Sequence, residues 1–210
     1  MKKLFLTTLV ACGFAVVSAQ AGIVSYSSRA AWEVAVGGLY SEEDFNSYTS
    51  ATSYQTTGVD VGDFTVSMTG SDFGSIWHNI GPVSNFNDVN GTGQINAATG
   101  STGGTTLTWD SSIYAFGAYF KGTSDSRVTK IMVNGDEVAL PDTSGGTAFF
   151  GYVSDTAFTS ELLFLFSGPA DGFGIDNVVY SDASVPDSGA TLALLGSALF
   201  GLAALRRRAT

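Results

Sequence analysis

Short runs of β-branched and aromatic residues alternate with turn residues along the middle of the chain, and this pattern predicts a mainly β domain. Strands are expected at Ile23–Tyr26, Asp63–Met68, Thr105–Trp109, Ile113–Phe120, Arg127–Val133, Glu137–Leu140, Ala148–Val153, Glu161–Phe166 and Gly174–Tyr180. Many short strands separated by loops indicate a single jelly-roll-like β-sandwich that spans residues 22–184.

Three segments carry more local information. Asn134-Gly135 separates two predicted strands and is a strong signal for a two-residue hairpin, because both positions tolerate positive φ. Ile113–Phe120 is apolar on both faces, which is typical of a central strand. Asn90–Gly104 is rich in Gly, Thr, Asn and Ala, and its composition predicts an exposed, mobile loop.

One short helix is expected near the start of the domain. Ser28 is a good N-cap for a helix that continues through Val36, and Gly37-Gly38 would end it. Trp32 and Val36 are four residues apart, so both would pack on the same side.

The first 21 residues have the three parts of a secretory signal peptide. Lys2 and Lys3 form a charged start, an apolar segment follows, and the small residues Ala19 and Ala21 frame a cleavage site after Ala21. This interpretation implies the Sec translocon and signal peptidase as partners. The residues Leu9-Val10-Ala11-Cys12 also form a lipobox-like run, so a lipidated Cys12 is the alternative.

Cys12 is the only cysteine in the chain. Cleavage after Ala21 would therefore leave a chain without disulfides, cysteine nucleophiles or thiolate metal sites.

Residues 185–210 form a tripartite tail. The polar motif Val185, Pro186, Asp187, Ser188 and Gly189 is followed by the uncharged segment Ala190–Leu205 and by Arg206, Arg207 and Arg208. A helix over residues 190–205 would be roughly 24 Å long, close to the length that crosses a bilayer. The three arginines predict a cytoplasmic C-terminus and leave the domain outside the cell membrane.

The tail resembles the PEP-CTERM family of bacterial sorting signals in its Val-Pro-Asp-Ser-Gly variant, through residues 185–189, the apolar segment and the arginines. The resemblance implies transient membrane insertion and processing by an exosortase at or near the motif. The mature protein would then be at the cell surface or in the extracellular matrix.

The domain between the two terminal signals is strongly acidic. It has four basic and eighteen acidic residues, a net charge of −14. Such a surface repels nucleic acid and anionic lipid, so neither is expected as a partner.

Two acidic stretches of the domain suggest a structural Ca²⁺ site. The segments that contain Glu43-Asp44-Phe45 and Ile175-Asp176-Asn177 resemble the first and last strands of carbohydrate-binding jelly rolls, and this resemblance implies that the two strands are neighbours. Ca²⁺ prefers six to eight oxygen ligands, which Glu43, Asp44, Asp176 and Asn177 would help to supply if the strand ends meet. In the alternative, Asp176 and Asn177 only shape a strand edge and the other two side chains are solvated.

Three function classes remain open. An exported matrix or surface protein without catalytic activity needs only the terminal signals and a β domain. A carbohydrate-binding module would tether exopolysaccharide through an exposed aromatic side chain, and Trp77 is the candidate for stacking on a sugar ring. A secreted hydrolase is the least supported, because the single histidine, His78, has no recognisable nucleophile beside it.

Overall fold

The chain folds into a mainly β domain, as predicted. The computed structural model describes residues 22–70, 78–82, 87–99, 103–123, 128–133, 135–158, 161–166 and 171–184. These residues form the strands β1 (Ile23–Tyr26), β2 (Ser41–Glu43), β3 (Thr52–Ser53), β4 (Val59–Asp60), β5 (Phe64–Thr69), β6 (Asn79–Pro82), β7 (Gly93–Thr99), β8 (Gly104–Trp109), β9 (Ala115–Lys121), β10 (Thr129–Val133), β11 (Asp136–Ala139), β12 (Ala148–Ser154), β13 (Glu161–Phe166) and β14 (Asp171–Ser181), and the helix α1 (Arg29–Ala35).

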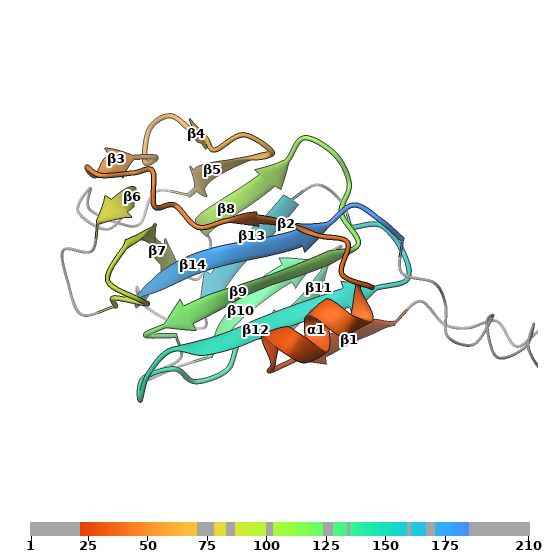
Figure 1. Ribbon diagram of the computed structural model, residues 1–210. Coiled ribbons are helices and arrows are strands. Elements are labelled where there is room, and N and C mark those ends of the chain that lie inside the picture. The colour runs from red at the N-terminus through yellow and green to blue at the C-terminus, as the bar shows by residue number, and fades with distance from the viewer. Residues whose placement is uncertain are drawn as a thin grey trace, which may run out of the picture.

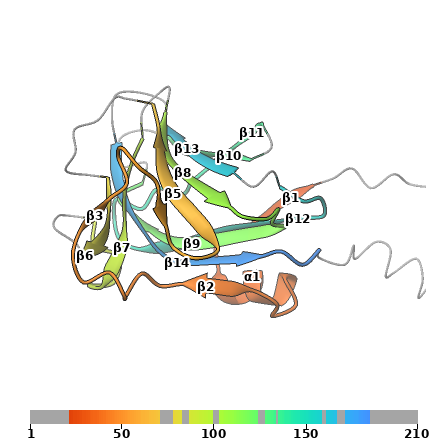
Figure 2. The same cartoon turned by 90° about the horizontal axis from the view of Figure 1, so that it is seen from above.

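All the strands belong to one curled antiparallel sheet (Figures 1 and 2). The main path runs β1-β12-β9-β14-β7-β8-β13-β10-β11, and the remaining strands extend it from β14, β7 and β8. Figure 2 shows the half with β12, β9 and β14 at an angle to the half with β5, β8 and β13. The sheet therefore bends over its own inner face.

Each of the nine predicted strands is present, with boundaries shifted by at most a few residues. β9 lies between β12 and β14, which confirms the central strand predicted from its apolar faces. β10 and β11 form the predicted hairpin, in which Val133 is opposite Asp136 and Gly135 has φ 88°. These features follow from local sequence, which explains why they were predictable.

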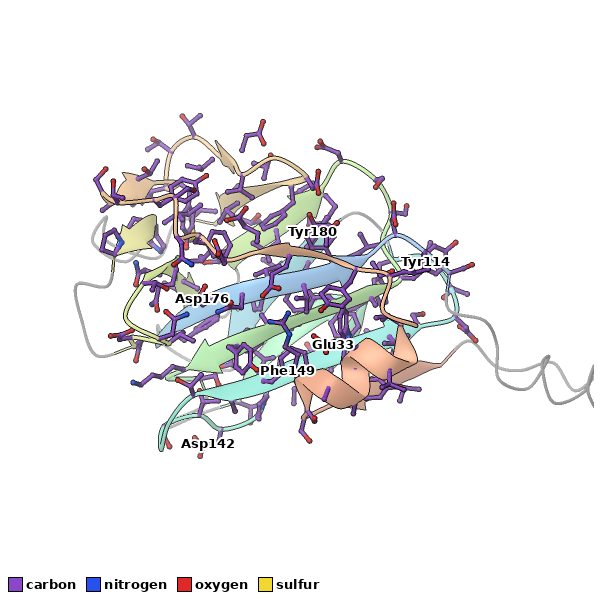
Figure 3. All side chains as sticks on the ribbon, in the orientation of Figure 1. Glu33, Tyr114, Asp142, Phe149, Asp176 and Tyr180 are labelled. Carbon is purple, nitrogen blue, oxygen red and sulfur yellow. The ribbon has the colours of Figure 1, made fainter. Side chains whose placement is uncertain are left out.

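The predicted helix is also confirmed. α1 begins after Ser28, whose hydroxyl accepts a hydrogen bond from the Ala31 N–H, and Val36 is its C-cap. Trp32 is fully buried between α1 and the outer face of the sheet, where its ring packs near that of Phe149, which Figure 3 labels. Its Nε1 donates to the Tyr152 carbonyl at 3.2 Å. Within the described ranges, no helix is long and apolar enough to cross a bilayer.

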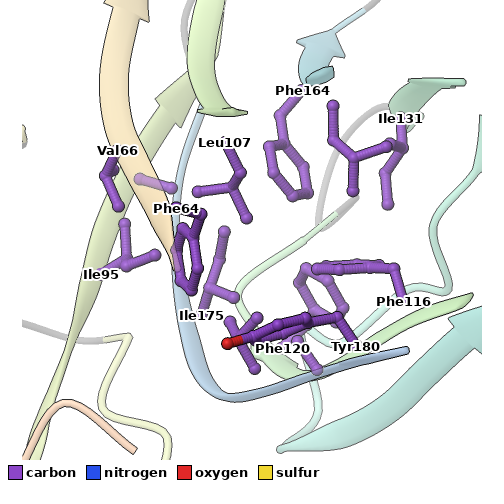
Figure 4. Close-up of a cluster of buried hydrophobic side chains, with 14 of the residues drawn as sticks. Phe64, Val66, Ile95, Leu107, Phe116, Phe120, Ile131, Phe164, Ile175 and Tyr180 are labelled. Carbon is purple, nitrogen blue, oxygen red and sulfur yellow. The ribbon is translucent and has the colours of Figure 1, made fainter. Parts of the chain in front are cut away.

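The main core fills the inside of the curl. Phe64 and Leu107 reach it from one half of the sheet, and Phe116 and Ile175 reach it from the other (Figure 4). Their exposed fractions are 1% or less. One continuous apolar core therefore holds the two halves together.

The prediction of a mobile loop over residues 90–104 was wrong for most of that segment. Residues 93–99 form β7, and all seven of its residues are buried. This strand pairs with β14, β6 and β8. Its polar side chains have partners: Gln94 donates to the Asn96 amide oxygen at 3.1 Å, and Asn96 donates to that of Asn79 at 2.8 Å. Buried amides that satisfy one another gave this strand the composition of a loop.

Gly93, at the start of β7, provides a test of this correction. A Cβ there would lie 2.1 Å from the Phe45 carbonyl oxygen, whereas a Cβ at Gly145 would meet nothing within 4 Å. Gly93→Ala should lower the free energy of unfolding by about 1–3 kcal/mol, since a packed strand would have to shift. Gly145→Ala should change it by no more than about 0.5 kcal/mol. Chemical denaturation checks this, and equal stabilities of the two variants would contradict the buried strand.

Candidate functional site

β14 changes its hydrogen-bonding partner in the middle of its length (Figure 1). Along one edge, its residues 171–175 pair with β7, and its residues 178–180 pair with β2. Along the other edge it pairs with β9, and the register of that pairing shifts between Asp176 and Val179. The irregular segment at Asp176 and Asn177 therefore lies where one neighbour ends and the next begins.

Two residues at this junction have left-handed backbone conformations. Asn177 has φ 49° and Phe45, just after β2, has φ 53°; they are the only non-glycine residues with positive φ in the described part of the chain. Asparagine tolerates this region, whereas phenylalanine rarely adopts it. The backbone N–H groups of both residues donate hydrogen bonds to carboxylates. The Phe45 N–H donates to Glu43 at 2.7 Å, and the Asn177 N–H donates to Asp176 at 2.6 Å. Acidic side chains thus stabilise the strained turns.

The Asp176 side chain is fully buried, and only one of its oxygens is satisfied (Figure 3). Oδ1 accepts the Asn177 N–H, and Oδ2 has no hydrogen-bond partner in the described part of the chain. Burial raises the pKa of this carboxyl to about 7; the Asn177 N–H opposes that shift, and the negative charge of Asp44 adds to it. A buried, unpaired oxygen in an acidic surrounding favours either a proton or a cation.

Asn90 also lies beside this carboxyl, and its side chain acts to lower the pKa of Asp176. The segment before β7 places it there. The Asn87 amide donates to the Gly172 carbonyl of β14 at 2.5 Å, and the Val89 N–H donates to the Gln94 side chain at 2.9 Å. Sequence reasoning missed Asn90 because its neighbourhood was interpreted as a free loop.

The structure brings the four predicted calcium residues to one junction. Glu43 is opposite Val178 in the β2–β14 pairing, which places it and Asp44 next to Asp176 and Asn177. Asp44 already accepts hydrogen bonds from the N–H and the side chain of Asn46, at 3.0 and 2.8 Å. In the described ranges, no three His, Cys, Asp or Glu side chains are arranged to hold a metal ion.

Glu42, the other acidic residue of β2, is already neutralised. Arg29 donates from both terminal nitrogens to the two Glu42 oxygens, each at 2.7 Å, and from Nε to Glu33 at 2.8 Å. These hydrogen bonds raise the pKa of Arg29. The bond from Arg29 to Glu33 also lowers the pKa of the Glu33 carboxyl. Glu42 is therefore a structural ion-pair partner of α1, and Asp44 is the acid beside Asp176 for which the described residues provide no such cation.

Several predicted site residues lie outside the described residues. They are Ala19 and Ala21 of the signal cleavage site, Trp77, the motif Val185, Pro186, Asp187, Ser188 and Gly189, the apolar segment 190–205, and Arg206, Arg207 and Arg208. His78 is fully buried, and burial lowers the pKa of its imidazole. The His78 side chain therefore lies in the interior of the domain.

The raised pKa of Asp176 predicts an unusual dependence of stability on pH. Between the ordinary value of 3.8 and about 7, the folded state binds more protons than the unfolded state. The free energy of unfolding should therefore fall as pH rises through this range, and the loss should be complete above it. Thermal melts of the wild type and of Asp176→Asn, in chelator at pH 5 and pH 8, measure this contribution. The substitution should reduce the loss of melting temperature at pH 8, and identical pH dependence of the two proteins would contradict the assignment.

Comparison with known proteins adds information about the tail. Residues 184–209 match the family model of the VPDSG-CTERM motif, which agrees with the polar motif, apolar segment and arginines found in the sequence. The chain matches no curated protein. The chain therefore carries a C-terminal sorting signal of the VPDSG-CTERM type, a variant of the PEP-CTERM signals that exosortases process.

Proposed function

We propose that this protein is an exported component of the cell surface or extracellular matrix, without catalytic activity of its own. In this proposal its first 21 residues direct it through the Sec translocon and are removed by signal peptidase. The apolar segment 190–205 then holds it in the inner membrane until an exosortase cuts at or near residues 185–189. The match of residues 184–209 to the VPDSG-CTERM motif is the observation that carries the proposal.

The folded domain is consistent with this role. Aromatic side chains from both halves of the curled sheet, such as Phe116 and Phe164, pack against each other inside it. The space between the two halves is therefore a filled core. We also propose that the curled sheet is a jelly-roll-like sandwich, since residues from its two halves meet across that core. A binding activity, including the tethering of exopolysaccharide, would then belong to the outer surface or to the ends of the sheet.

The sorting proposal is tested in cells that contain a cognate exosortase. The wild type should be processed near residue 185 and leave the membrane fraction, whereas a chain without residues 185–210 should not be retained there before release. Asp187→Ala should accumulate as a membrane-bound precursor, because the processing enzyme reads the motif. Asp182→Ala, which changes an acid just before the motif, is the matched control and should be processed normally.

Fractionation and mass spectrometry of the C-terminus provide the measurement. Intact wild-type protein dissolved in the cytosol, or normal processing of Asp187→Ala, would contradict the proposal.

A second proposal concerns Ca²⁺ at the β2–β14 junction. Asp176 has a buried, unpaired oxygen, and Asp44 adds a negative charge with no basic partner in the described residues. The amide oxygen of Asn177, with backbone carbonyls and water, would complete the oxygen-rich shell that Ca²⁺ prefers. Glu43 would support the site by holding the strained turn at Phe45. Bound Ca²⁺ would offset the repulsion between the two carboxylates and fix the meeting point of the strands.

Calcium should raise the melting temperature of the wild type at pH 8 relative to chelator, because a ligand that binds only the folded state stabilises it. Asp176→Asn and Asp44→Asn should both reduce this shift, and Asp142→Asn, an exposed acid in a distant turn, should retain it. Calorimetry checks binding directly. Absence of both heat and a melting shift in the wild type would exclude the calcium site.

A further inference from the structure

The segment that leads into β7 contains an Asn-Gly pair in an exposed position. Asn90, Gly91 and Thr92 are all exposed, and a Cβ at Gly91 would meet nothing within 4 Å. The backbone nitrogen that follows an asparagine can attack the side-chain amide of that asparagine. Glycine hinders this attack least, because it has no side chain. The pair therefore meets the first requirement for this reaction, and solvent water can reach it.

The side chain of Asn90 is folded back over the backbone that follows it. Its Oδ1 accepts one hydrogen bond from the Thr92 N–H at 3.0 Å and a second from the Thr92 hydroxyl. The first of these bonds closes a ring that contains both the amide carbon of Asn90 and the Gly91 nitrogen, which keeps the two atoms close. Both donors also point at the oxygen that gains negative charge when the amide carbon is attacked. Thr92 thus holds the amide in place and polarises it.

A carboxylate lies at the attacking nitrogen. The Gly91 N–H donates to Oδ1 of Asp88 at 2.5 Å. A carboxylate bonded to the proton that must leave is in the position of a general base. This N–H lies in the plane of its peptide, whereas attack occurs perpendicular to that plane, so the bond to Asp88 leaves the attacking face of the nitrogen free.

We propose that Asn90 is a self-modification site, at which the folded chain converts this asparagine into aspartate or isoaspartate. The Gly91 nitrogen forms a bond to the amide carbon of Asn90, and its proton passes to the Asp88 carboxylate. That proton is then transferred to the side-chain nitrogen, which leaves as ammonia, and a five-membered imide remains. Water opens the imide at one of its two carbonyls. Opening at the side-chain carbonyl gives aspartate, and opening at the backbone carbonyl gives isoaspartate.

The product changes the charge at the β2–β14 junction. Asn90 lies beside the Asp176 carboxyl, and Asp44 already places a negative charge there. Conversion would add a third carboxylate, which increases the repulsion between like charges above neutral pH. The reaction depends on neither the calcium proposal nor the sorting proposal, since it needs only the residues of this segment and water.

The conversion is measured against a second Asn-Gly pair of the chain, Asn134-Gly135. The purified protein is kept at pH 8 in water enriched in the heavy oxygen isotope, and peptide mapping by mass spectrometry measures the label at residues 90 and 134. Residue 90 should convert faster in the folded protein than in guanidinium chloride, because the contacts of Asp88 and Thr92 form only on folding. Equal or slower conversion of residue 90 in the folded protein would overturn the proposal.

Two substitutions test the roles of the neighbouring side chains. Asp88→Asn keeps an acceptor for the Gly91 N–H but removes the base, so it should slow conversion of residue 90 at least about fivefold. Thr92→Val removes the hydroxyl donor and should also slow conversion, whereas Thr92→Ser retains the hydroxyl and should convert at the wild-type rate. Residue 134 should be unaffected in all three variants. Wild-type conversion of residue 90 in Asp88→Asn, or equal slowing at residues 90 and 134, would refute the site.

Discussion

The architecture depends on the way β14 pairs with three other strands. It bonds to β9 along one edge and to β7 and then β2 along the other, so it connects the strand that follows α1 to the middle of the sheet. The change of partner from β7 to β2 falls at Asp176 and Asn177, where the register of the pairing with β9 also shifts. The curl, the enclosed core and the position of the acidic junction all follow from that arrangement.

The same irregularity places a carboxylate where a buried charge is expensive. Asp176 satisfies the left-handed turn at Asn177 with one oxygen and leaves the other without a partner. An apolar residue would avoid the desolvation of a carboxylate, but it could not accept the Asn177 N–H. A strained turn and a half-satisfied acid together are typical of a binding site, and this is the physical basis of the calcium proposal.

Sequence reasoning succeeded where one local signal dominated. The cap at Ser28, the turn at Gly135 and the apolar faces of β9 depend on neighbouring residues, and all three are confirmed. It failed at β7, because Gln94 and Asn96 satisfy their buried amides through partners on the loop and on other strands. The short β2 is absent from the strands predicted from the residue pattern and was suggested only by resemblance, since only its pairing with β14 defines it. The meeting of two acidic segments was anticipated by resemblance, whereas the position of Asn90 beside Asp176 needs the folded chain.

The protein thus combines a sorting signal that is recognisable in the sequence with a domain in which the acidic residues of β2 and β14 meet only after folding. The protonation state of Asp176 is the central physical claim, because the strand junction, the strained turn and the proposed calcium site all involve its carboxyl. An NMR titration of the Asp176 side-chain carboxyl carbon, in chelator, measures it directly. The account predicts a midpoint near pH 7. A midpoint close to the ordinary aspartate value of about 4 would contradict it.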